Sequence, residues 1–465
     1  MTANTNVMMA ECRILRVNTC QMGQFKDKTT LENWELPADT KDLAPLQEAA
    51  RHLRDGVIPV GFPTETVYGL GADATRSEAV KGIYKAKGRP LDNPLIIHIC
   101  DLTMLRSLIV PTGGQDGDGG SKDPIPAIYK PLIEKFWPGP LTILLPNPKV
   151  SKLAPEVTAG LPTFGARMPD SPLALSLIHL AGVPLAAPSA NASTKPSPTT
   201  AEHVRHDLQG KIEIILDGGP CLVGVESTVV DGLCEPPVLL RPGGVSIDRI
   251  RECEGWACVV KGYKDASEEG SSSAPRAPGM KYKHYSPKAK VILYEATPRN
   301  FVQNGLSDES ILISRAQKKE IAHLGYEDLT QSAKIGIINT KNWGEWAYID
   351  KERSDGRRRI LIQNQRVLTT SNSFSMNQGE IWVEEMGHQE SGEGGPSSDN
   401  NKLADVISIS LGKNTKDIAH GLFSALRELD LQGVDVVYVE GIKDEGDIAA
   451  AVMNRLRKAS FMIEC

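Results

Sequence analysis

Two cations stand two residues apart in this chain of 465 residues, at Lys87 and Arg89, with Gly88 between them and Pro90 behind. Glycine and proline both take a chain out of regular helix. In an extended chain, the side chains at i and i+2 point the same way. The spacing therefore predicts two cations that face one polyanion, such as a phosphate chain, in preference to a solvated loop.

Further charged and polar groups stand at the ends of predicted strands. Arg167 lies in "TFGARMPD", Arg241 ends the strand in "LLRPGG", and Glu226 and Ser227 precede the strand in "STVVDG". The loop "PSANASTKPSPT" at 188–199 offers hydroxyl and amide donors for phosphate oxygens, although its composition alone also fits an ordinary surface turn. So many cations exceed what a sheet needs for solubility. They favour a site that holds a triphosphate and a second anion, such as a carboxylate.

Two further patterns are less specific. "GFPTETVYGLGADA" contains Gly69-x-Gly71-x-x-Ala74, a loose dinucleotide fingerprint, but "TETVY" separates the strand from the first glycine and disfavours nicotinamide binding. The hydroxyls at this strand end are candidate ligand contacts, at even odds with an ordinary loop. His98 in "LIIHI" faces away from its apolar neighbours, and spacing alone favours a hydrogen-bonded core histidine. The sequence has no GxxxxGK[ST] P-loop.

These residues need a scaffold, and helical and strand patterns alternate from about residue 45 to 260. This order predicts an α/β domain with a mixed sheet. Helical spacing is found in "DLAPLQEAARHLRDG", "RSEAVKGIYKAKG", "PLALSLIHLAG" and "AEHVRHDLQG". Strand patterns are found in "VIPVGFP", "PLIIHIC", "LTILLP", "PLAAPSAN", "IEIILDGG" and "STVVDG". A glycine-rich segment at 111–124 interrupts the domain and is expected to be a surface insertion.

A second α/β unit follows a flexible linker predicted at 265–279, which leads into the basic and aromatic "MKYKHYSPKAK". Its predicted strands are "KVILYE", "SILISR", "KIGIIN", "VISISLG" and "VDVVYVEGI". Its predicted helices are "TKDIAHGLFSALRELDLQG" and "DIAAAVMNRLRKAS". The polar stretch between Asn342 and Lys402 is expected to be irregular, and "GHQESGEGGPSSDNN" within it is expected to be disordered.

The bulk composition excludes several classes of protein. A net charge of -6 and a pI of about 5.9 create no global field for nucleic acid, so any RNA contact must be local. The 8 cysteines form no CxxC pair, which argues against a zinc ribbon or a disulfide scaffold and for a reducing compartment. No apolar run is long enough to span a membrane. The N-terminal residues 1–40 predict a frayed tail, with weak organelle targeting as the alternative.

Eight segments in sequence order together resemble the YrdC-like family of threonylcarbamoyl-adenylate synthases in its two-domain form. They are "PTETVYGLG", "KAKGRPLDNPLIIHI", "FWPGPLT", "GARMP", "APSANASTKPSPT", "GVESTVVD", "LLRPGG" and "KHYSP". The resemblance implies an N-terminal tail at 1–40 and a YrdC-like catalytic domain at 41–261, with a twisted mixed sheet and a concave basic cavity. A linker and lid at 262–288 and a smaller Rossmann-like α/β domain at 289–465 would follow.

The resemblance also implies roles for particular residues. The family's lysine-x-arginine and serine-x-asparagine pattern falls on the catalytic set Lys87, Arg89, Ser189 and Asn191. The threonine-binding residues would be Thr66, His98, Arg167, Ala187 and Ser227, of which Ala187 offers only backbone groups. The ATP-binding residues would be Arg89, Asn93, Thr163, Ser189, Ser197, Arg241 and Tyr285, and no protein side chain is expected to bind a metal.

The implied activity is that of a nucleotidyltransferase. L-threonine, bicarbonate or CO2, and ATP with Mg²⁺ would become threonylcarbamoyl-AMP and pyrophosphate. A separate tRNA threonylcarbamoyl transferase complex would then modify the adenosine next to the anticodon. We expect a cytoplasmic enzyme with a minor mitochondrial fraction, weak RNA binding and no membrane partner. The alternative is an RNA-binding module without catalysis, whose cations hold double-stranded RNA or tRNA.

Overall fold

The computed structural model describes residues 11–39, 41–110, 123–263, 284–296, 333–347, 358–371, 373–385, 401–446 and 448–464. The chain divides into two compact units, Met1–Tyr285 with Gly446–Asn454, and Ser286–Glu445 with Arg455–Cys465. We call them unit 1 and unit 2. The division after Tyr285 falls inside the predicted linker at 262–288. The predicted linker at 265–279, the strand "SILISR" and nearly all of the insertion at 111–124 lie outside the described residues.

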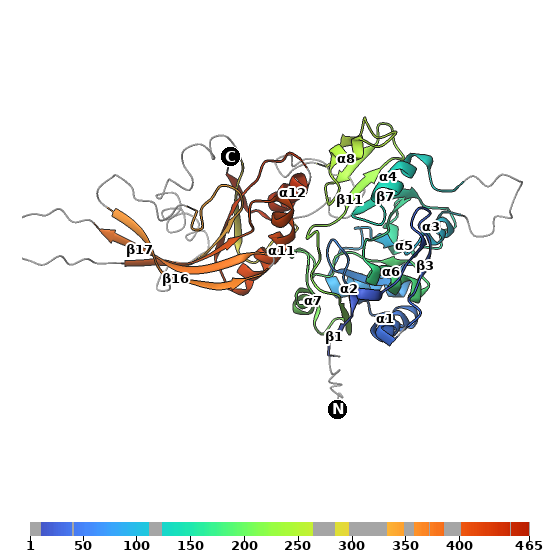
Figure 1. Ribbon diagram of the computed structural model, residues 1–465, viewed down its shortest axis with the longest axis horizontal. Helices are drawn as coiled ribbons and strands as arrows, with labels where there is room; N and C mark the ends of the chain where they lie inside the picture. The colour runs from blue at the N-terminus through green and yellow to red at the C-terminus, as the bar shows by residue number, and fades with distance from the viewer. Residues whose placement is uncertain are drawn as a thin grey trace, which may run out of the picture. The chain divides into compact units, whose positions relative to one another are not determined.

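Unit 1 is built on a mixed sheet of 11 strands, in the order β1-β10-β4-β5-β9-β6-β8-β7-β11-β12-β13 (Figure 1). Parallel pairs such as β6 with β8 stand beside antiparallel pairs such as β6 with β9, so the predicted mixed sheet is confirmed. The strands are β1 (Arg13–Arg16), β4 (Val60–Phe62), β5 (Gly69–Asp73), β6 (Ile96–His98), β7 (Leu141–Pro146), β8 (Thr163–Arg167), β9 (Leu185–Ala186), β10 (Ile214–Asp217), β11 (Thr228–Asp231), β12 (Val238–Arg241) and β13 (Val260–Lys261).

Four helices of unit 1, α1, α2, α6 and α7, form where helical spacing predicted them, whereas α3, α4, α5 and α8 were not predicted. Helix α1 buries Leu46, Ala49, Ala50 and Leu53, the apolar stripe of its sequence, and packs against α6 and β10. The helices are α1 (Ala44–Asp55), α2 (Ser77–Lys87), α3 (Leu102–Ile109), α4 (Lys130–Phe136), α5 (Pro155–Thr158), α6 (Pro172–Ala181), α7 (Ala201–Leu208) and α8 (Ile247–Arg251). Short 3-10 helices occupy Thr19–Gln21, Lys41–Leu43 and Ala127–Tyr129.

The expectation of a frayed tail at 1–40 is wrong for residues 11–39. Strand β1 pairs with β10 along its whole length, and β2 (Gln24–Asp27) and β3 (Glu32–Glu35) form a separate antiparallel pair. Trp34 is buried, and its Nε1 donates a hydrogen bond to Ser176 Oγ at 2.9 Å. Each of these strands has only four residues and buries one side chain or none, so the sequence carries too weak a period to predict them.

Unit 2 contains a sheet of 7 strands, in the order β16-β17-β18-β15-β19-β14-β20. Neighbours from β18 to β20 are parallel, which confirms the Rossmann-like α/β prediction, whereas β16, β17 and β18 pair antiparallel. The strands are β14 (Lys290–Tyr294), β15 (Ala333–Asn339), β16 (Arg358–Thr370), β17 (Ser375–Glu385), β18 (Asn401–Ser410), β19 (Val436–Glu440) and β20 (Met462–Glu464). Helix α11 (Thr415–Leu431) lies in unit 2, whereas α12 (Ala449–Ala459) is divided after Asn454 between unit 1 and unit 2. None of the helices in the described part of the chain has the length and hydropathy to span a membrane.

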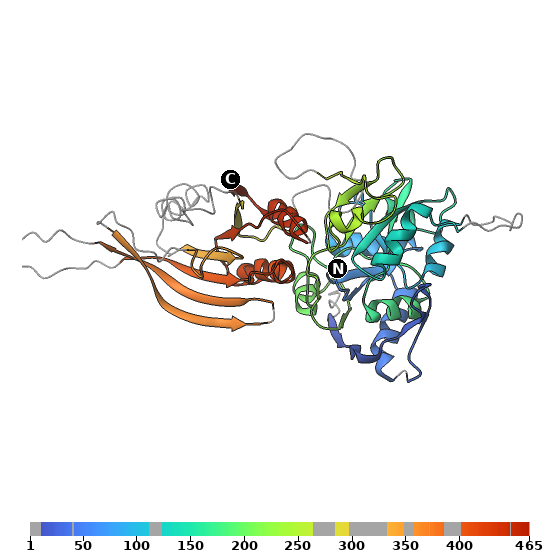
Figure 2. The same ribbon diagram turned by 45° about the horizontal axis from the view of Figure 1, so that its top comes forward.

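The expectation of an irregular stretch between Asn342 and Lys402 is wrong where the structure describes it. This stretch holds β16 and β17, the long paired strands drawn in orange and visibly curved in Figure 2. Much of β16 is exposed, and its described side chains at 361–370 form no buried apolar face from which a strand could be predicted. Backbone hydrogen bonds to β17 stabilise β16 instead, and backbone hydrogen bonds cannot be predicted from the pattern of side chains.

Candidate active site

A cavity in unit 1 gathers polar side chains that are far apart in the sequence. Its empty space is about 770 Å³, counting the part that is open to solvent. The predicted site residues that line it are Lys87, Arg89, Ser189, Asn191, Thr66, His98, Arg167, Ala187, Ser227, Arg241 and Tyr285. The predicted cations therefore meet in one place, as the hypothesis of an anion site requires.

Three predicted ATP-binding residues do not line this cavity. Asn93 is buried, and its carbonyl accepts hydrogen bonds from Tyr84 and Arg89. Thr163 begins β8 and pairs with Pro146 of β7. Ser197 is buried and donates a hydrogen bond to Glu226 Oε1 at 2.5 Å. Glu226 does line the cavity. Ser197 is therefore linked to the cavity through its hydrogen bond to the Glu226 carboxylate.

Lys87 is held by the loop that carries the serine-x-asparagine pair. Its Nζ donates hydrogen bonds to the backbone oxygens of Ser189 at 2.5 Å and Asn191 at 2.6 Å. The expectation that Lys87 and Arg89 lie in an extended segment is wrong, because Lys87 ends helix α2 and Gly88 caps it at φ 62°. A left-handed backbone conformation costs little free energy only at glycine. The reversal at Gly88 thus takes the place of strand geometry in directing both cations to one cavity.

Arg89 keeps its charge in confined surroundings. Its Nη2 donates to the Pro94 carbonyl at 3.0 Å and its Nε to the Asn93 carbonyl at 3.3 Å. The pKa of Arg89 is lowered to about 10, chiefly by burial, and the nearby charge of Arg241 acts in the same direction. The guanidinium is still protonated at neutral pH. Like charges at close quarters favour an anionic ligand between them.

His98 and Arg167 are neighbours across the sheet. Strand β6 pairs in parallel with β8 so that His98 lies opposite Arg167, and Ile96 and His98 both line the cavity. Burial, followed by the charge of Arg167, lowers the pKa of His98 to about 3. His98 is therefore a neutral imidazole at physiological pH. It can offer hydrogen bonds to a small polar ligand but no positive charge.

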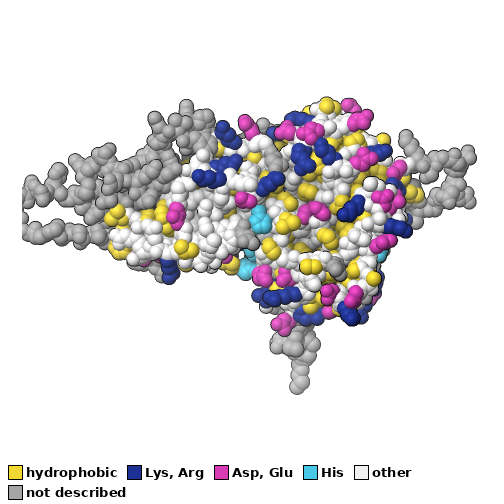
Figure 3. All heavy atoms as spheres, in the orientation of Figure 1, with side chains coloured by type: hydrophobic (Ala, Val, Ile, Leu, Met, Phe, Trp, Pro, Cys, Tyr) yellow, Lys and Arg dark blue, Asp and Glu magenta, His cyan; other side chains and the backbone are white. Residues whose placement is uncertain are grey.

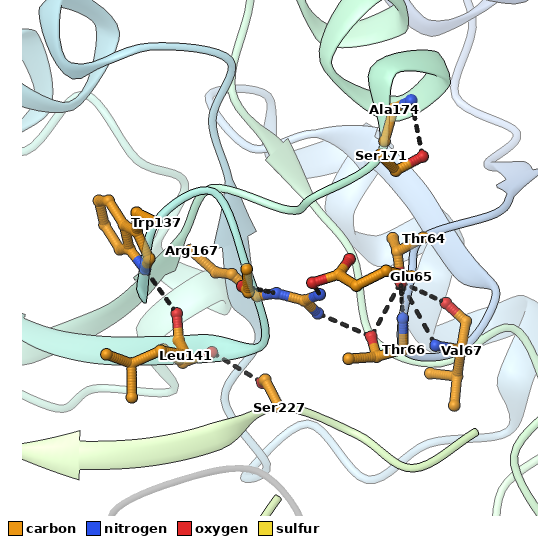
Figure 4. Close-up of polar contacts among 12 residues, drawn as sticks. Thr64, Glu65, Thr66, Val67, Trp137, Leu141, Arg167, Ser171, Ala174 and Ser227 are labelled. Carbon is orange, nitrogen blue, oxygen red and sulfur yellow. Dashed lines mark hydrogen bonds and ion pairs between the residues drawn. The ribbon is translucent and has the colours of Figure 1, made fainter. Parts of the chain in front are cut away.

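Arg167 is anchored on several sides (Figure 4). Its Nε donates to the Gly139 carbonyl at 3.0 Å, its Nη1 to Thr66 Oγ1 at 2.8 Å, and its Nη2 to Glu65 Oε1. A guanidinium has five N–H groups, so two of them have no acceptor among the described residues. A carboxylate can accept two such hydrogen bonds. Arg167 is therefore the group best suited to an amino-acid carboxylate.

Arg241 and Ser227 form a second fixed pair. Arg241 donates to the Ser227 backbone oxygen from Nε at 3.1 Å and from Nη2 at 2.9 Å, and Ser227 Oγ lies 2.8 Å from Thr142 Oγ1. Gly243 follows Arg241 in "LLRPGG" and passes so close to the backbone at 226–228 that a Cβ would collide with it. This close approach explains the glycine and holds Arg241 against the cavity wall.

Sequence reasoning assigned no binding role to several residues that line this cavity, among them Glu226, His284 and Lys195. Glu226 adds a carboxylate to a basic site, and His284 precedes Tyr285 in "KHYSP". Lys195 lies 3.1 Å from the buried carboxylate of Asp207 in α7. Glu226 and His284 stand inside the motifs "GVESTVVD" and "KHYSP", which was the available signal. Nothing in the sequence pairs Lys195 with Asp207, because that contact exists only after the loop at 188–199 folds onto α7.

Fold and cavity together define a two-unit α/β protein whose first unit carries a basic, ligand-sized pocket. A family model described as "Telomere recombination" matches residues 51–243, and the model of the "Threonylcarbamoyl-AMP synthase, C-terminal domain" matches residues 245–460. The chain belongs to the threonylcarbamoyl-AMP synthase family in its two-domain form.

Relatives and solved structures agree with this assignment. The chain is 43% identical to the threonylcarbamoyl-AMP synthase of Schizosaccharomyces pombe, over 92% of this chain and 90% of that protein. It is 39% identical to the Bacillus subtilis enzyme of the same name, over 89% of this chain and 92% of that one. The crystal structure of Pyrococcus abyssi Sua5 complexed with L-threonine covers 97% of this chain and 99% of that one, with a TM-score of 0.63 and 35% identity.

Proposed function

We propose that this chain is an L-threonylcarbamoyladenylate synthase, a nucleotidyltransferase that makes threonylcarbamoyl-AMP and pyrophosphate from L-threonine, bicarbonate or CO2, and ATP. The observation that carries the proposal is that one cavity holds both kinds of site that the reaction needs. Lys87, Arg89 and Arg241 supply positive charge for a phosphate chain. Arg167 and neutral His98 supply donors for a small amino acid.

The reaction needs alignment and charge neutralisation more than covalent help from the protein. The carbamate formed from threonine attacks the α-phosphorus of ATP, and pyrophosphate leaves. Arg89 and Arg241 stabilise the charge that develops on the phosphates. Lys87 contributes its charge through space while its Nζ holds the loop of Ser189 and Asn191 in place. Arg167 holds the threonine carboxylate with its two remaining N–H groups.

Mg²⁺ would accompany ATP as part of the substrate. Octahedral Mg²⁺ is commonly held by substrate phosphates, several waters and one or two carboxylates. The described cavity fits this pattern, since Glu226 brings a carboxylate next to the cations that would bind the phosphates. When bound, Mg²⁺ would neutralise phosphate charge. Removal of Mg²⁺ with EDTA should abolish pyrophosphate release, and added Mg²⁺ should restore it.

Pyrophosphate release is the decisive test. The purified chain should release pyrophosphate from ATP only when threonine and bicarbonate are both present. Turnover without threonine would contradict the proposal. An RNA-binding module would instead shift the mobility of RNA with steep salt dependence and turn over nothing. On the face drawn in Figure 3, Lys and Arg side chains are interspersed with Asp and Glu among the described residues, which gives RNA no particular support.

The fate of the product and the location of the enzyme stay predictions. Threonylcarbamoyl-AMP is a labile mixed anhydride, so we expect a separate tRNA threonylcarbamoyl transferase complex to consume it. That complex would modify the adenosine next to the anticodon of tRNA. A cytoplasmic location with a minor mitochondrial fraction fits this role. Incorporation of labelled threonine into tRNA, with the complex added back, would test the handover.

A further inference from the structure

The Arg167 guanidinium is paired with a buried carboxylate that the reaction scheme above does not use. Glu65 Oε1 accepts from Arg167 Nη2, and the two side chains are only 5% and 4% exposed. Glu65 follows β4 and stands between Thr64 and Thr66, which both line the cavity. Glu65 itself is not a lining residue. In the view of Figure 4, its carboxylate and the Ser227 hydroxyl lie on opposite sides of the Arg167 side chain.

The segment that carries Glu65 is itself rigid. Thr64 Oγ1 donates to the Val67 carbonyl at 2.7 Å and accepts from the backbone N–H groups of Thr66 and Val67. The Glu65 carbonyl accepts from the Val223 N–H at 2.7 Å. The backbone of Glu65 is thus held from two sides, and its side chain reaches Arg167 from a fixed base.

Arg167 is the counter-ion of Glu65, and the pair is tight. The other carboxylate oxygen, Oε2, is buried and has no hydrogen-bond partner in the part of the chain that the structure describes. Burial, followed by the charge of Glu65, raises the pKa of Asp170 and that of Cys221. A buried carboxylate with one unsatisfied oxygen depends strongly on its single charged partner. Glu65 therefore resists any movement of the Arg167 guanidinium.

We propose that Glu65 is a positioning residue for amino-acid binding. It locks Arg167 so that the two N–H groups without an acceptor among the described residues stay available to the carboxylate of the amino acid. This inference rests on the proposed function, because it takes the ligand of Arg167 to be threonine. The opposite role would make Glu65 a place-holder that occupies Arg167 until the substrate carboxylate displaces it. The anchoring by Gly139 and Thr66 favours positioning, since a place-holder needs a guanidinium that can be released.

Two substitutions separate these roles in the full-length protein. Glu65→Gln keeps the shape and one acceptor oxygen but removes the charge, whereas Glu65→Ala removes both. We expect Glu65→Ala to weaken threonine binding about tenfold or more, and Glu65→Gln to weaken it less, because loss of a buried charged partner is costly. Calorimetry with threonine measures this directly. The dissociation constant of a non-hydrolysable ATP analogue should change less than about twofold, since Arg89 and Arg241 do not touch Glu65.

Glu156→Gln is the matched control. Glu156 also has a carboxylate with one buried oxygen that has no partner among the described residues, and its other oxygen accepts from Ser77 Oγ at 2.6 Å, away from the cavity lining. This control should leave threonine binding unchanged.

In steady-state assays the Glu65 variants should raise the KM for threonine while kcat at saturating threonine stays within about twofold.

Several outcomes would overturn the inference. Unchanged or tighter threonine binding by folded Glu65→Gln and Glu65→Ala would do so, and tighter binding would establish the place-holder role. If Glu65→Ala does not fold, Glu65→Gln decides alone. A wild-type protein that binds no threonine would instead refute the proposed function, so the two failures can be told apart.

Discussion

At the scale of single residues, the site depends on which groups keep their charge under burial. Arg89 stays protonated even though burial and a neighbouring cation lower its pKa to about 10. His98 does not, because its ordinary pKa is already near neutrality and burial lowers it to about 3. The wall of the cavity that carries Arg89 is therefore positively charged and suited to bind phosphates. His98, which lies opposite Arg167 in the sheet, stays neutral.

Arg89→Ala should remove phosphate stabilisation without disturbing the fold. We expect pyrophosphate release with threonine and bicarbonate present to slow by roughly 10²–10³-fold, the usual cost of losing one such donor. Threonine binding should change little, because Arg89 is hydrogen-bonded to Asn93 and Pro94 rather than to the Arg167 network. A near-normal rate would remove Arg89 from the site.

His98 should make unit 1 sensitive to acid. In the unfolded chain it binds a proton below pH of about 6.5, but in the folded chain only near pH 3, so stability falls as the pH drops between these values. Between pH 7 and pH 5, the wild type should lose about 2 kcal/mol from this residue, and His98→Gln should not. Urea titrations at both pH values measure the difference.

The control for this experiment is His179→Gln, which replaces an exposed histidine in α6. Identical pH dependence in the wild type and His98→Gln would show that His98 is not the group responsible.

At the scale of elements, the end of α2 decides where the two cations go. Lys87 is the last residue of the helix, Gly88 turns left-handed, and Arg89 emerges on the cavity side. The loop at 188–199 is drawn to the same place by backbone hydrogen bonds. The Leu70 N–H donates to the Pro188 carbonyl, and the Ala190 N–H donates to the Tyr68 carbonyl, both at 2.8 Å.

Gly88→Ala tests this turn. An added Cβ meets nothing within 4 Å, so the cost is conformational and should be about 1 kcal/mol of folding free energy. Gly182 caps α6 at φ 68° with the same open space, so Gly182→Ala should cost a similar amount. Only Gly88→Ala should also raise the KM for ATP, because only Gly88 directs cavity residues. Equal KM values for the two variants would refute the role of the turn.

At the scale of the whole molecule, the motif "KHYSP" places His284 and Tyr285 in the lining of the cavity of unit 1. The lid predicted at 262–288 falls mostly outside the described residues, so its closing role stays a prediction. Exclusion of water would protect a labile anhydride. A covering segment is a common way to achieve this.

Removal of residues 262–465 tests the lid. We expect the shortened chain to release pyrophosphate more slowly and to lose threonylcarbamoyl-AMP to hydrolysis sooner than the full chain. Chromatographic measurement of the lifetime of the intermediate would detect the loss. Tyr285→Ala in the full-length protein should move both quantities in the same direction. Full activity and an unchanged lifetime in the shortened chain would refute the lid.

The sequence alone determined much of the local structure and marked many of the polar residues that line the cavity. Apolar periods placed helices such as α1 and α11 and strands such as β6 and β7, because burial of an apolar face leaves a period in the sequence. The spacing of Lys87 and Arg89 marked the cations, although the extended geometry inferred for them was wrong. Strands β1 and β16 were not predicted, because they are stabilised by backbone pairing with neighbouring strands. The types of side chain along a segment do not reveal such pairing.

Only the tertiary structure decided which residues meet. The ion pair of Glu65 with Arg167 and the bonds from Lys87 to the loop at 188–199 join positions about a hundred residues apart. In the folded chain, Ser197 and Asn93 do not line the cavity, whereas Glu226 does. The physical reason is that burial, and with it each charge state, depends on every neighbour at once. A pattern along the chain records only the neighbours in sequence.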